Sequence, residues 1–345
     1  MTGVKARMKV YEILEGSTSL DSLKKTERER PEPGPGQVLV KVHSAALNYR
    51  DQAVVTGNYF GGVVQRNTIP LSDGAGEVTA VGKDVTRFKP GDRVAGTFFQ
   101  VWVDGIPVPA SFAALGSPLD GVLAEYVVLH QDGLVVIPDY LGYEAAAALP
   151  CAAVTAWNAL MFSGHTRPGD TVLCLGTGGV SIFALQFAKM NGARVIITSS
   201  SDDKLKRAAK LGADDGINYS KHPDWEKEVM RLTRGRGVDN VIEVGGIGTL
   251  NRSMESLGYR GQVSLIGVLA GREGSSNPHN LMLKAGRLQG IFVGNRVMFE
   301  DMLRAMAVNR MQPVVDKVFG FDEVHAAYRY QLEKKHFGKI VINID

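Results

Sequence analysis

The sequence contains only two cysteines, Cys151 and Cys174, among its 345 residues. Two cysteines cannot build a disulfide framework, and their scarcity favours a reducing compartment over a secreted protein. The N-terminal segment, residues 1–9, also lacks the apolar core of a signal peptide. We therefore expect a cytoplasmic protein.

Metal-ligand patterns, long apolar runs and charge of one sign are scarce as well. None of the seven histidines has metal-ligand spacing, and His43 lies in a strand pattern where a structural role is expected. The formal net charge is only +3, and no basic run carries interleaved aromatic residues. The longest apolar stretch, residues 145–162, is interrupted by Pro150, Thr155 and Asn158, which predicts buried helix and loop. Neither a nucleic acid nor a membrane partner is expected.

The composition is that of an ordinary globular protein. Hydrophobic residues make up 44% of the chain and charged residues 22%. A chain of 345 residues exceeds what one compact core usually organises, so two domains with a cleft between them are expected.

Up to about residue 136 the chain is a series of short β-like runs separated by glycine and proline. These runs are residues 10–14, 38–42, 76–81, 93–95 and 124–129. Many short strands with turn signals at this spacing indicate a barrel-like or sandwich-like β domain.

From about residue 171 buried strand patterns alternate with helical segments. The strands are expected at residues 171–175, 194–198, 238–244 and 262–266, and the helices at 181–190, 201–211 and 223–233. Strand and helix in alternation predict a parallel, doubly wound sheet.

A glycine-rich turn, Gly176-Thr-Gly-Gly-Val-Ser181, joins the first of these strands to a helix. Gly176 permits a tight turn, and Gly178 lets a pyrophosphate approach the N–H groups at the helix N-terminus. Ser181 replaces the third glycine of the G-x-G-x-x-G pattern but is still small. A turn without a ligand is the alternative, but the repeated strand–helix units favour dinucleotide binding.

The end of the second strand bears on the choice between NAD and NADP. An NAD-preferring protein would have an acidic residue here for the ribose 2′-hydroxyl. The sequence instead has the uncharged Ser199, with Ser200 and Lys204 able to donate hydrogen bonds to a 2′-phosphate, so NADP(H) is favoured. Alternatively the serines only cap a helix, and Asp202 and Asp203 weaken the case for NADP(H).

Several motifs together make the chain resemble the medium-chain dehydrogenase/reductase superfamily, in particular its zinc-free quinone oxidoreductase-like branch. The motifs are Leu47-Asn-Tyr-Arg-Asp51, Asp73-Gly-Ala-Gly-Glu-Val78, Lys89-Pro-Gly-Asp-Arg-Val94, Gly121-Val-Leu-Ala-Glu-Tyr126, Leu149-Pro-Cys-Ala-Ala-Val-Thr-Ala-Trp157, Leu211-Gly-Ala213, Ile217-Asn-Tyr219 and Phe337-Gly-Lys-Ile-Val341.

The resemblance implies an architecture and an assembly. It implies a GroES-like, β-rich catalytic domain, residues 1–151 and 293–345, into which an α/β Rossmann domain that binds NADP(H), residues 152–292, is inserted. It also implies a homodimer that pairs the edges of two Rossmann sheets near residues 290–293. A small-molecule substrate is the other expected partner.

The zinc ligands of metal-dependent relatives have no equivalent set here. The corresponding positions hold Asn48, Ser72 and Cys151, and one thiolate does not hold a catalytic zinc, which needs three protein ligands. The four-cysteine structural zinc lobe is also absent, so no metal is expected. In its place, the aromatic residues between Thr97 and Asp120 either line an apolar pocket or pack against the β domain.

Without zinc, the resemblance implies that backbone N–H groups, ribose hydroxyls and polar side chains orient the substrate carbonyl. Our candidates are Asn48 as a donor near the nicotinamide, Tyr49 as a donor or proton source, and Asp51 as an anchor of their loop. A structural role is the alternative for each.

The resemblance also implies the cofactor contacts residue by residue. They are Thr155 near the nicotinamide; Gly176, Gly178, Gly179 and Val180 on the pyrophosphate; Ser199, Ser200, Lys204 and Tyr219 around the adenosine phosphate; Gly245, Ile266 and Gly267 along the nicotinamide half; and Phe292, Val293 and Lys339 closing the site. For Ile266 and Phe292, core packing is the alternative.

The expected activity is NADPH-dependent hydride transfer to a quinone, an enone or a related carbonyl compound. Two alternatives remain: an alcohol dehydrogenase that acts on a CH–OH donor, and a relative that binds NADPH without catalysis.

Overall fold

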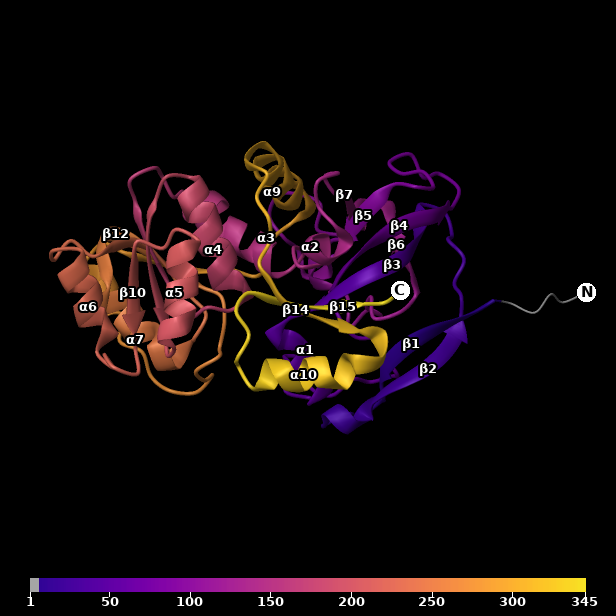
Figure 1. The fold of residues 1–345 in the computed structure, drawn as a ribbon, viewed down its shortest axis with the longest axis horizontal. Helices are drawn as coiled ribbons and strands as arrows, with labels where there is room; N and C mark the ends of the chain where they lie inside the picture. Colours follow the sequence, from indigo (N-terminus) through magenta and orange to yellow (C-terminus); the bar gives the residue numbers. More distant parts are fainter. Residues whose placement is uncertain (1–5) are drawn as a thin grey trace, which may run out of the picture. The chain divides into compact units, whose positions relative to one another are not determined.

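The structure is a computed structural model that describes residues 6–345; the first five residues, which belong to the segment expected to lack a signal peptide, lie outside it. The chain divides into two compact units. The first runs up to Val154 and resumes at Gly294, and the second spans Thr155–Val293. The first boundary lies three residues, and the second boundary one residue, further along the chain than expected. In Figure 1 the second unit is the magenta-to-orange part of the ribbon.

The first unit is built mainly from β-strands. They form a two-stranded sheet, β1-β2, and a seven-stranded sheet in the order β14-β15-β3-β4-β5-β7, with β6 also paired to β3. Their bounds are β1 Arg7–Ile13, β2 Leu23–Glu29, β3 Gln37–Leu47, β4 Asp73–Val81, β5 Arg93–Gly96, β6 Tyr126–His130, β7 Leu134–Val136, β14 Val315–Gly320 and β15 Lys339–Asn343.

Strand β3 is the centre of this unit because it pairs with strands from both ends of the chain. It is antiparallel to β4 and β6, and also to β15, with Leu47 opposite Ile340. Figure 1 shows the yellow C-terminal strands β14 and β15 beside the indigo strand β3. Residues almost three hundred positions apart are therefore brought together.

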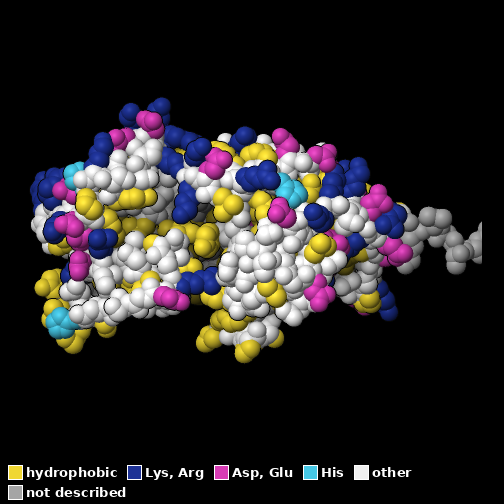
Figure 2. Space-filling view, turned by 90° about the horizontal axis from the view of Figure 1, so that it is seen from below, with side chains coloured by type: hydrophobic (Ala, Val, Ile, Leu, Met, Phe, Trp, Pro, Cys, Tyr) yellow, Lys and Arg dark blue, Asp and Glu magenta, His cyan; other side chains and the backbone are white. Residues whose placement is uncertain are grey.

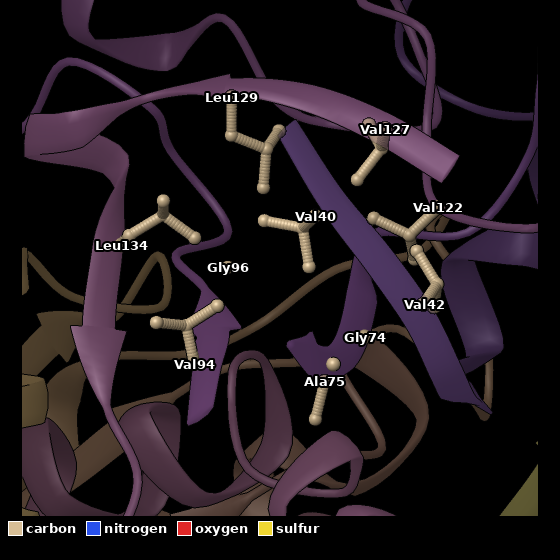
Figure 3. A pocket seen from close by; sticks show the side chains of 11 residues that line it. Val40, Val42, Gly74, Ala75, Val94, Gly96, Val122, Val127, Leu129 and Leu134 are labelled. Carbon is tan, nitrogen blue, oxygen red and sulfur yellow. The ribbon is translucent and has the colours of Figure 1, made fainter. Parts of the chain in front are cut away.

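The space enclosed by the strands of the first unit is filled by side chains. Figure 3 shows Val40, Val94, Val127 and Leu134, which come from four different strands, around this space. The remaining cavity is only about 10 Å³, no more than one water molecule needs. This space is too small to be a ligand pocket. It is a stabilising core, because burying each of these aliphatic side chains contributes roughly 1.5–3 kcal/mol.

Short helices connect and cover the strands of the first unit. They are the 3₁₀ turns η1 Leu20–Ser22, η2 Pro109–Phe112, η3 Gln131–Gly133 and η5 Phe321–Glu323, and the helices α1 Tyr49–Val55, α2 Tyr143–Ala147, α9 Arg296–Asn309 and α10 Val324–Leu332. Helix α3, Ala152–Trp157, runs across the boundary into the second unit. Together with α2 and the π-helix η4, Asn158–Phe162, it accounts for the apolar stretch expected to be buried helix and loop.

The second unit is a parallel six-stranded sheet in the order β10-β9-β8-β11-β12-β13. Its strands are β8 Thr171–Cys174, β9 Arg194–Ser199, β10 Asp215–Asn218, β11 Val238–Glu243, β12 Leu257–Leu265 and β13 Arg287–Gly290. Its helices are α4 Gly179–Met190, α5 Asp202–Lys210, α6 Trp225–Leu232, α7 Ile247–Glu255 and α8 His279–Leu283. The predicted Rossmann domain is thereby confirmed, with β10 and β13 as strands that the sequence pattern did not indicate.

The strand order changes direction beside β8, which has β9 on one side and β11 on the other. In sheets of this kind, ligands bind beyond the carboxyl ends of the strands at such a switch point. The outer strand β13 is exposed at all four residues and has no neighbour on its far side among the residues described. The segment expected near a dimer contact, residues 290–293, begins at Gly290, the last residue of β13.

One face of the surface is mixed in charge. On the face drawn in Figure 2, Lys and Arg side chains lie among Asp and Glu side chains. No helix within residues 6–345 is both long and apolar enough to cross a membrane.

Candidate functional site

The predicted cofactor residues of the second unit gather at one edge of its sheet. Gly176 follows β8, Ser200 follows β9, Tyr219 follows β10, Gly245 follows β11, and Gly267 follows β12. Because neighbouring strands of this sheet run parallel, these five positions share the carboxyl edge at which Rossmann sheets bind nucleotides.

The turn after β8 leaves room where a pyrophosphate would lie. Gly176 has φ +72°, a conformation that favours glycine, and its N–H donates to the Thr198 hydroxyl at 3.0 Å. Gly178 precedes α4, and no side chain caps this helix end. A Cβ on either glycine would meet nothing within 4 Å. The first turn of α4 can therefore offer its N–H groups to an anion.

Ser181 replaces the usual third glycine without opening the helix–strand contact. Its hydroxyl donates to the Leu175 carbonyl at 2.6 Å, and the residue is fully buried. The serine thus fastens the start of α4 to the end of β8. The replacement of the third glycine by serine therefore does not weaken the contact between α4 and β8.

The serines after β9 are partly engaged in local capping. The Ser199 hydroxyl accepts from the N–H of Ser201 at 3.2 Å, and the Ser201 hydroxyl accepts from the N–H of Lys204 at 3.4 Å. Ser200 is exposed. Asp202 is bonded at 2.6 Å to Lys221, so its charge is compensated. The capping alternative therefore describes Ser201, while Ser200 remains available to a ligand.

A residue that sequence reasoning missed, Glu243, holds the next turn of the carboxyl edge. It ends β11 fully buried, and its carboxylate accepts from the N–H groups of Gly245 at 2.7 Å and Gly246 at 3.0 Å. It also accepts from the hydroxyls of Thr249, at 2.6 Å, and Ser253. An acidic residue that ends a buried strand, one residue before a Gly-Gly pair, is a signal that could have revealed it.

The remaining predicted cofactor residues have mixed environments. Thr155 is buried, Phe292 is 41% exposed, and the Val293 carbonyl accepts from the Asn158 amide at 2.7 Å. At Gly267 a Cβ would lie 2.4 Å from the Val244 carbonyl, so only glycine allows this approach of two chain segments. Positions Gly179, Val180 and Ile266 are half-buried along the same edge.

The first unit contains a buried polar cluster around Lys339. Strand pairing places Ile340 opposite Leu47, so the neighbouring Lys339 lies beside Asn48. The Lys339 ammonium donates to the Leu47 carbonyl at 2.7 Å and to the Asn48 side-chain oxygen at 2.6 Å. It lies 3.6 Å from the Asp73 carboxylate. Lys339, predicted to close the cofactor site, is thus buried with its charge directed at Asn48 and Asp73.

The same cluster joins the three positions that correspond to zinc ligands. Asp73 accepts from the Ser72 hydroxyl at 2.7 Å and from the backbone N–H of Cys151 at 3.2 Å. Burial raises the pKa of the Cys151 thiol, and the nearby Asp73 raises it further. The Cys151 side chain is therefore a neutral thiol in this environment.

The donor set does not fit a zinc ion. Amide and hydroxyl groups stand where nitrogen or thiolate ligands are needed, and a buried ammonium lies among them. Within residues 6–345, no three His, Cys, Asp or Glu side chains are grouped so as to hold a metal.

The loop that begins α1 holds the other two predicted catalytic residues. Asp51 accepts from the backbone N–H of Asn48 at 2.7 Å and lies 3.6 Å from the Arg50 guanidinium. Tyr49, at the first position of α1, is half exposed. Asp51 is thus placed as an anchor of the loop, and Tyr49 has a side chain that solutes can reach.

The aromatic residues between Thr97 and Asp120 serve mainly as packing. Phe98, Phe99 and Trp102 are buried, and Phe99 contacts both of the others as well as Phe112. Only Phe112 of this group is exposed by more than a third. Of the two alternatives for this segment, packing describes these side chains.

Asp51 is expected to make stability depend on pH. Burial raises its pKa from 3.8 to about 6, with Asp73 adding to the rise and Arg50 opposing it. The folded protein therefore binds this proton more tightly than the unfolded chain. Its free energy of unfolding falls as pH rises through about 6. The gain in stability from Asp51→Asn should grow by about 2 kcal/mol between about pH 4.5 and about pH 8, as measured by urea unfolding.

The matched control is Asp92→Asn, at an aspartate whose pKa is lowered by hydrogen bonds to Lys89. Asp92→Asn should lower the free energy of unfolding, because an ionised Asp92 is favoured in the folded state, and this loss should hardly change above about pH 4.5, where the carboxyl is ionised in both states. A stability difference for Asp51→Asn that is flat across this pH range would show that Asp51 is ionised in the folded protein throughout.

Comparison with known proteins identifies the family. Residues 34–139 match the sequence profile of the alcohol dehydrogenase GroES-like domain, and residues 179–308 match that of the zinc-binding dehydrogenases. A zinc-type alcohol dehydrogenase-like protein from Schizosaccharomyces pombe is 44% identical over 343 residues, covering 97% of this chain and 99% of that one. The chain belongs to the medium-chain dehydrogenase/reductase superfamily.

Other members of the superfamily are similar as well. The quinone oxidoreductase-like protein 2 of Bos taurus is 28% identical, covering 92% of this chain and 88% of its own. A crystal structure of a candidate alcohol dehydrogenase from Sinorhizobium meliloti superposes with a TM-score of 0.92 at 43% identity, covering 99% and 100% of the two chains. That of an NAD-dependent alcohol dehydrogenase gives 0.88 at 33% identity, covering 98% and 100%.

These comparisons confirm the superfamily and the two-domain fold class that the sequence motifs indicated. This dehydrogenase/reductase is an oxidoreductase, and its relatives point to a nicotinamide cofactor.

Proposed function

We propose that the protein is an NADPH-dependent reductase that transfers hydride to a quinone, an enone or a related carbonyl compound without zinc. The observation that carries the proposal is the Lys339 ammonium, hydrogen-bonded at 2.6 Å to Asn48, which stands where metal-dependent relatives place their first ligand. A fixed positive charge at this place disfavours a second cation. The name of the quinone oxidoreductase-like relative agrees with this class of activity.

The carboxyl edge of the second unit fits a dinucleotide. The open turn at Gly176 and Gly178 would hold the pyrophosphate, and Gly245 and Gly267 would border the nicotinamide half. When bound, the cofactor would supply the hydride.

The preference for NADPH rests on the region after β9. Of the two acidic residues there, Asp202 is engaged by Lys221 and by the Asn218 amide, each at 2.6 Å, and Asp203 pairs with Lys206 at 3.2 Å. The exposed Ser200 and Tyr219 would donate to a 2′-phosphate.

In the first unit, Asn48 and Tyr49 are the residues proposed to act on the substrate carbonyl. A carbonyl oxygen gains negative charge when hydride is added, and a preorganised N–H or O–H donor stabilises that charge. The backbone of Asn48 is held by Asp51, so the donor keeps its place during the reaction.

The test is consumption of NADPH, with NADH in parallel, by chelator-treated protein given a panel of quinones, enones, aldehydes and ketones. We expect turnover that survives chelation and is faster with NADPH. Activity that is lost with the chelator and restored by zinc would favour an alcohol dehydrogenase instead. Tight NADPH binding without turnover of any acceptor would favour a non-catalytic relative.

A further inference from the structure

The side chain of Asn48 is oriented by Lys339. Lysine can only donate hydrogen bonds, so the oxygen of the Asn48 amide must face the ammonium, and the NH₂ group must point away from it. The amide is not needed to cap α1, because the N–H of Asp51 donates to the Asn48 backbone carbonyl at 3.1 Å and the N–H of Asn48 donates to the Asp51 carboxylate. This pair of contacts leaves one orientation for the amide.

The Lys339 ammonium is itself held in place on three sides. It donates to the Leu47 carbonyl as well as to Asn48, and the Asp73 carboxylate lies 3.6 Å away. Lys339 is 3% exposed and Asp73 is fully buried. The ammonium therefore makes two hydrogen bonds and one ion pair within the protein, and these contacts hold it in place.

The NH₂ group of Asn48 is only weakly engaged among the residues described. Its hydrogen bond to the Ser72 hydroxyl measures 3.5 Å, at the upper limit for such a bond, while that hydroxyl donates to Asp73 at 2.7 Å. An ammonium on the amide oxygen draws electron density from the nitrogen, which makes its N–H groups stronger donors. The NH₂ group of Asn48 is thus a polarised donor that can still donate a strong hydrogen bond.

We infer that Lys339 is a positioning residue that acts through Asn48: it fixes and polarises the amide so that its N–H donates to the substrate carbonyl oxygen. The inference rests on the proposed function. In that reaction a hydride adds to the β-carbon of an enone, the C=C electron pair forms the new C=C bond of an enolate, and the carbonyl electron pair moves to oxygen. The oxygen accepts the Asn48 hydrogen bond, and a proton from water completes the reduction.

The test is a double-mutant cycle of Lys339→Met and Asn48→Ala, read as kcat with the best acceptor. We expect Asn48→Ala to lower kcat roughly 100-fold and Lys339→Met roughly 10-fold or more, with little change in the KM for NADPH. In the Asn48→Ala background, Lys339→Met should cost almost nothing further. Independent, multiplicative losses, or a rise confined to the KM for NADPH, would overturn the inference.

Two further variants separate this role from a general loss of structure. Lys284→Met removes a lysine that is likewise bonded to backbone carbonyls, of Glu255 at 2.6 Å and Leu257 at 2.7 Å, but in the second unit. It should lower stability without lowering kcat. Asn48→Asp keeps an oxygen for Lys339 and removes the donor, so it should fold and still lose most of kcat. Full activity of Asn48→Asp would contradict the inference.

A readout independent of turnover distinguishes this inference from the proposed function. In protein labelled with ¹⁵N-asparagine, the side-chain NH₂ signal of Asn48 is identified by its absence in Asn48→Ala. It should shift in Lys339→Met and stay in place in Lys284→Met. If the parent protein reduces no acceptor but the signal shifts, the proposed function fails and the positioning stands. An unmoved signal would overturn the positioning whatever the activity.

Discussion

Gly178→Val is expected to lower the affinity for the nicotinamide cofactor by roughly 100-fold or more, a loss of about 3 kcal/mol. The dinucleotide is proposed to cross the turn at the start of α4, where the pyrophosphate would approach the backbone N–H groups. A Cβ at Gly178 meets no protein atom within 4 Å. The valine side chain would therefore occupy the space that the ligand needs.

The same substitution should leave the fold intact. Gly178 has φ −79° and ψ −177°, in the extended region that valine readily adopts. No side-chain cap is lost, because none is present. Fluorescence titration with NADPH measures the affinity, and thermal unfolding without cofactor checks the fold.

The control is Gly142→Val. Gly142 also precedes a helix, α2, in extended conformation with φ −71°, and a Cβ there would likewise meet nothing within 4 Å. It lies in the first unit, so cofactor affinity should not change. If Gly178→Val also bound NADPH as tightly as the parent, the pyrophosphate would have to lie elsewhere.

Glu243→Ala is expected to lower the free energy of unfolding of the second unit by about 2–6 kcal/mol. The carboxylate accepts from two backbone N–H groups and two hydroxyls in a fully buried place. Each buried donor that loses its partner costs about 1–3 kcal/mol. The hydroxyls can rotate to other acceptors, but the N–H groups of Gly245 and Gly246 cannot, and Gly246 is held at φ +83°.

The measurement combines urea unfolding with hydrogen exchange at the amides of Gly245 and Gly246, which should lose protection. Glu243→Gln keeps one oxygen for these amides and should be the milder change. Glu228→Ala, which breaks a surface pair with Arg231 at 2.8 Å in the same unit, should cost no more than about 1 kcal/mol. A Glu243→Ala protein as stable as Glu228→Ala would show that the turn holds without the carboxylate.

The features predicted best from the sequence are those whose signals are local. The strands at β8, β9 and β11 are short runs of almost entirely buried residues, and the turn from Gly176 to Gly178 lies directly between a strand and a helix. Each of these signals is contained in a short window of the chain. They were enough to predict a Rossmann domain with a cofactor turn at its carboxyl edge.

Strands whose side chains do not follow the usual pattern were missed for a physical reason. Strand β2 has the sequence Leu-Lys-Lys-Thr-Glu-Arg-Glu, and most of these residues are at least partly exposed. It is a strand because its backbone pairs with β1 along seven residues, not because it buries an apolar face. Strand β13 is likewise exposed at every residue. Backbone pairing alone does not require apolar and polar residues to alternate, so such a sequence lacks the pattern that predicts a strand.

By itself the sequence determined the two-domain class, the parallel sheet and the glycine turn, because hydrophobic periodicity and glycine conformation act over a few neighbouring residues. The resemblance to the superfamily added that the positions of the zinc ligands hold Asn48, Ser72 and Cys151. Only the tertiary structure decided what stands there instead. Lys339 and Asn48 are separated by 291 positions in the chain, and antiparallel pairing of β15 with β3 makes them neighbours. A contact of this kind depends on strand register across the whole unit, so the sequence around either residue does not predict it.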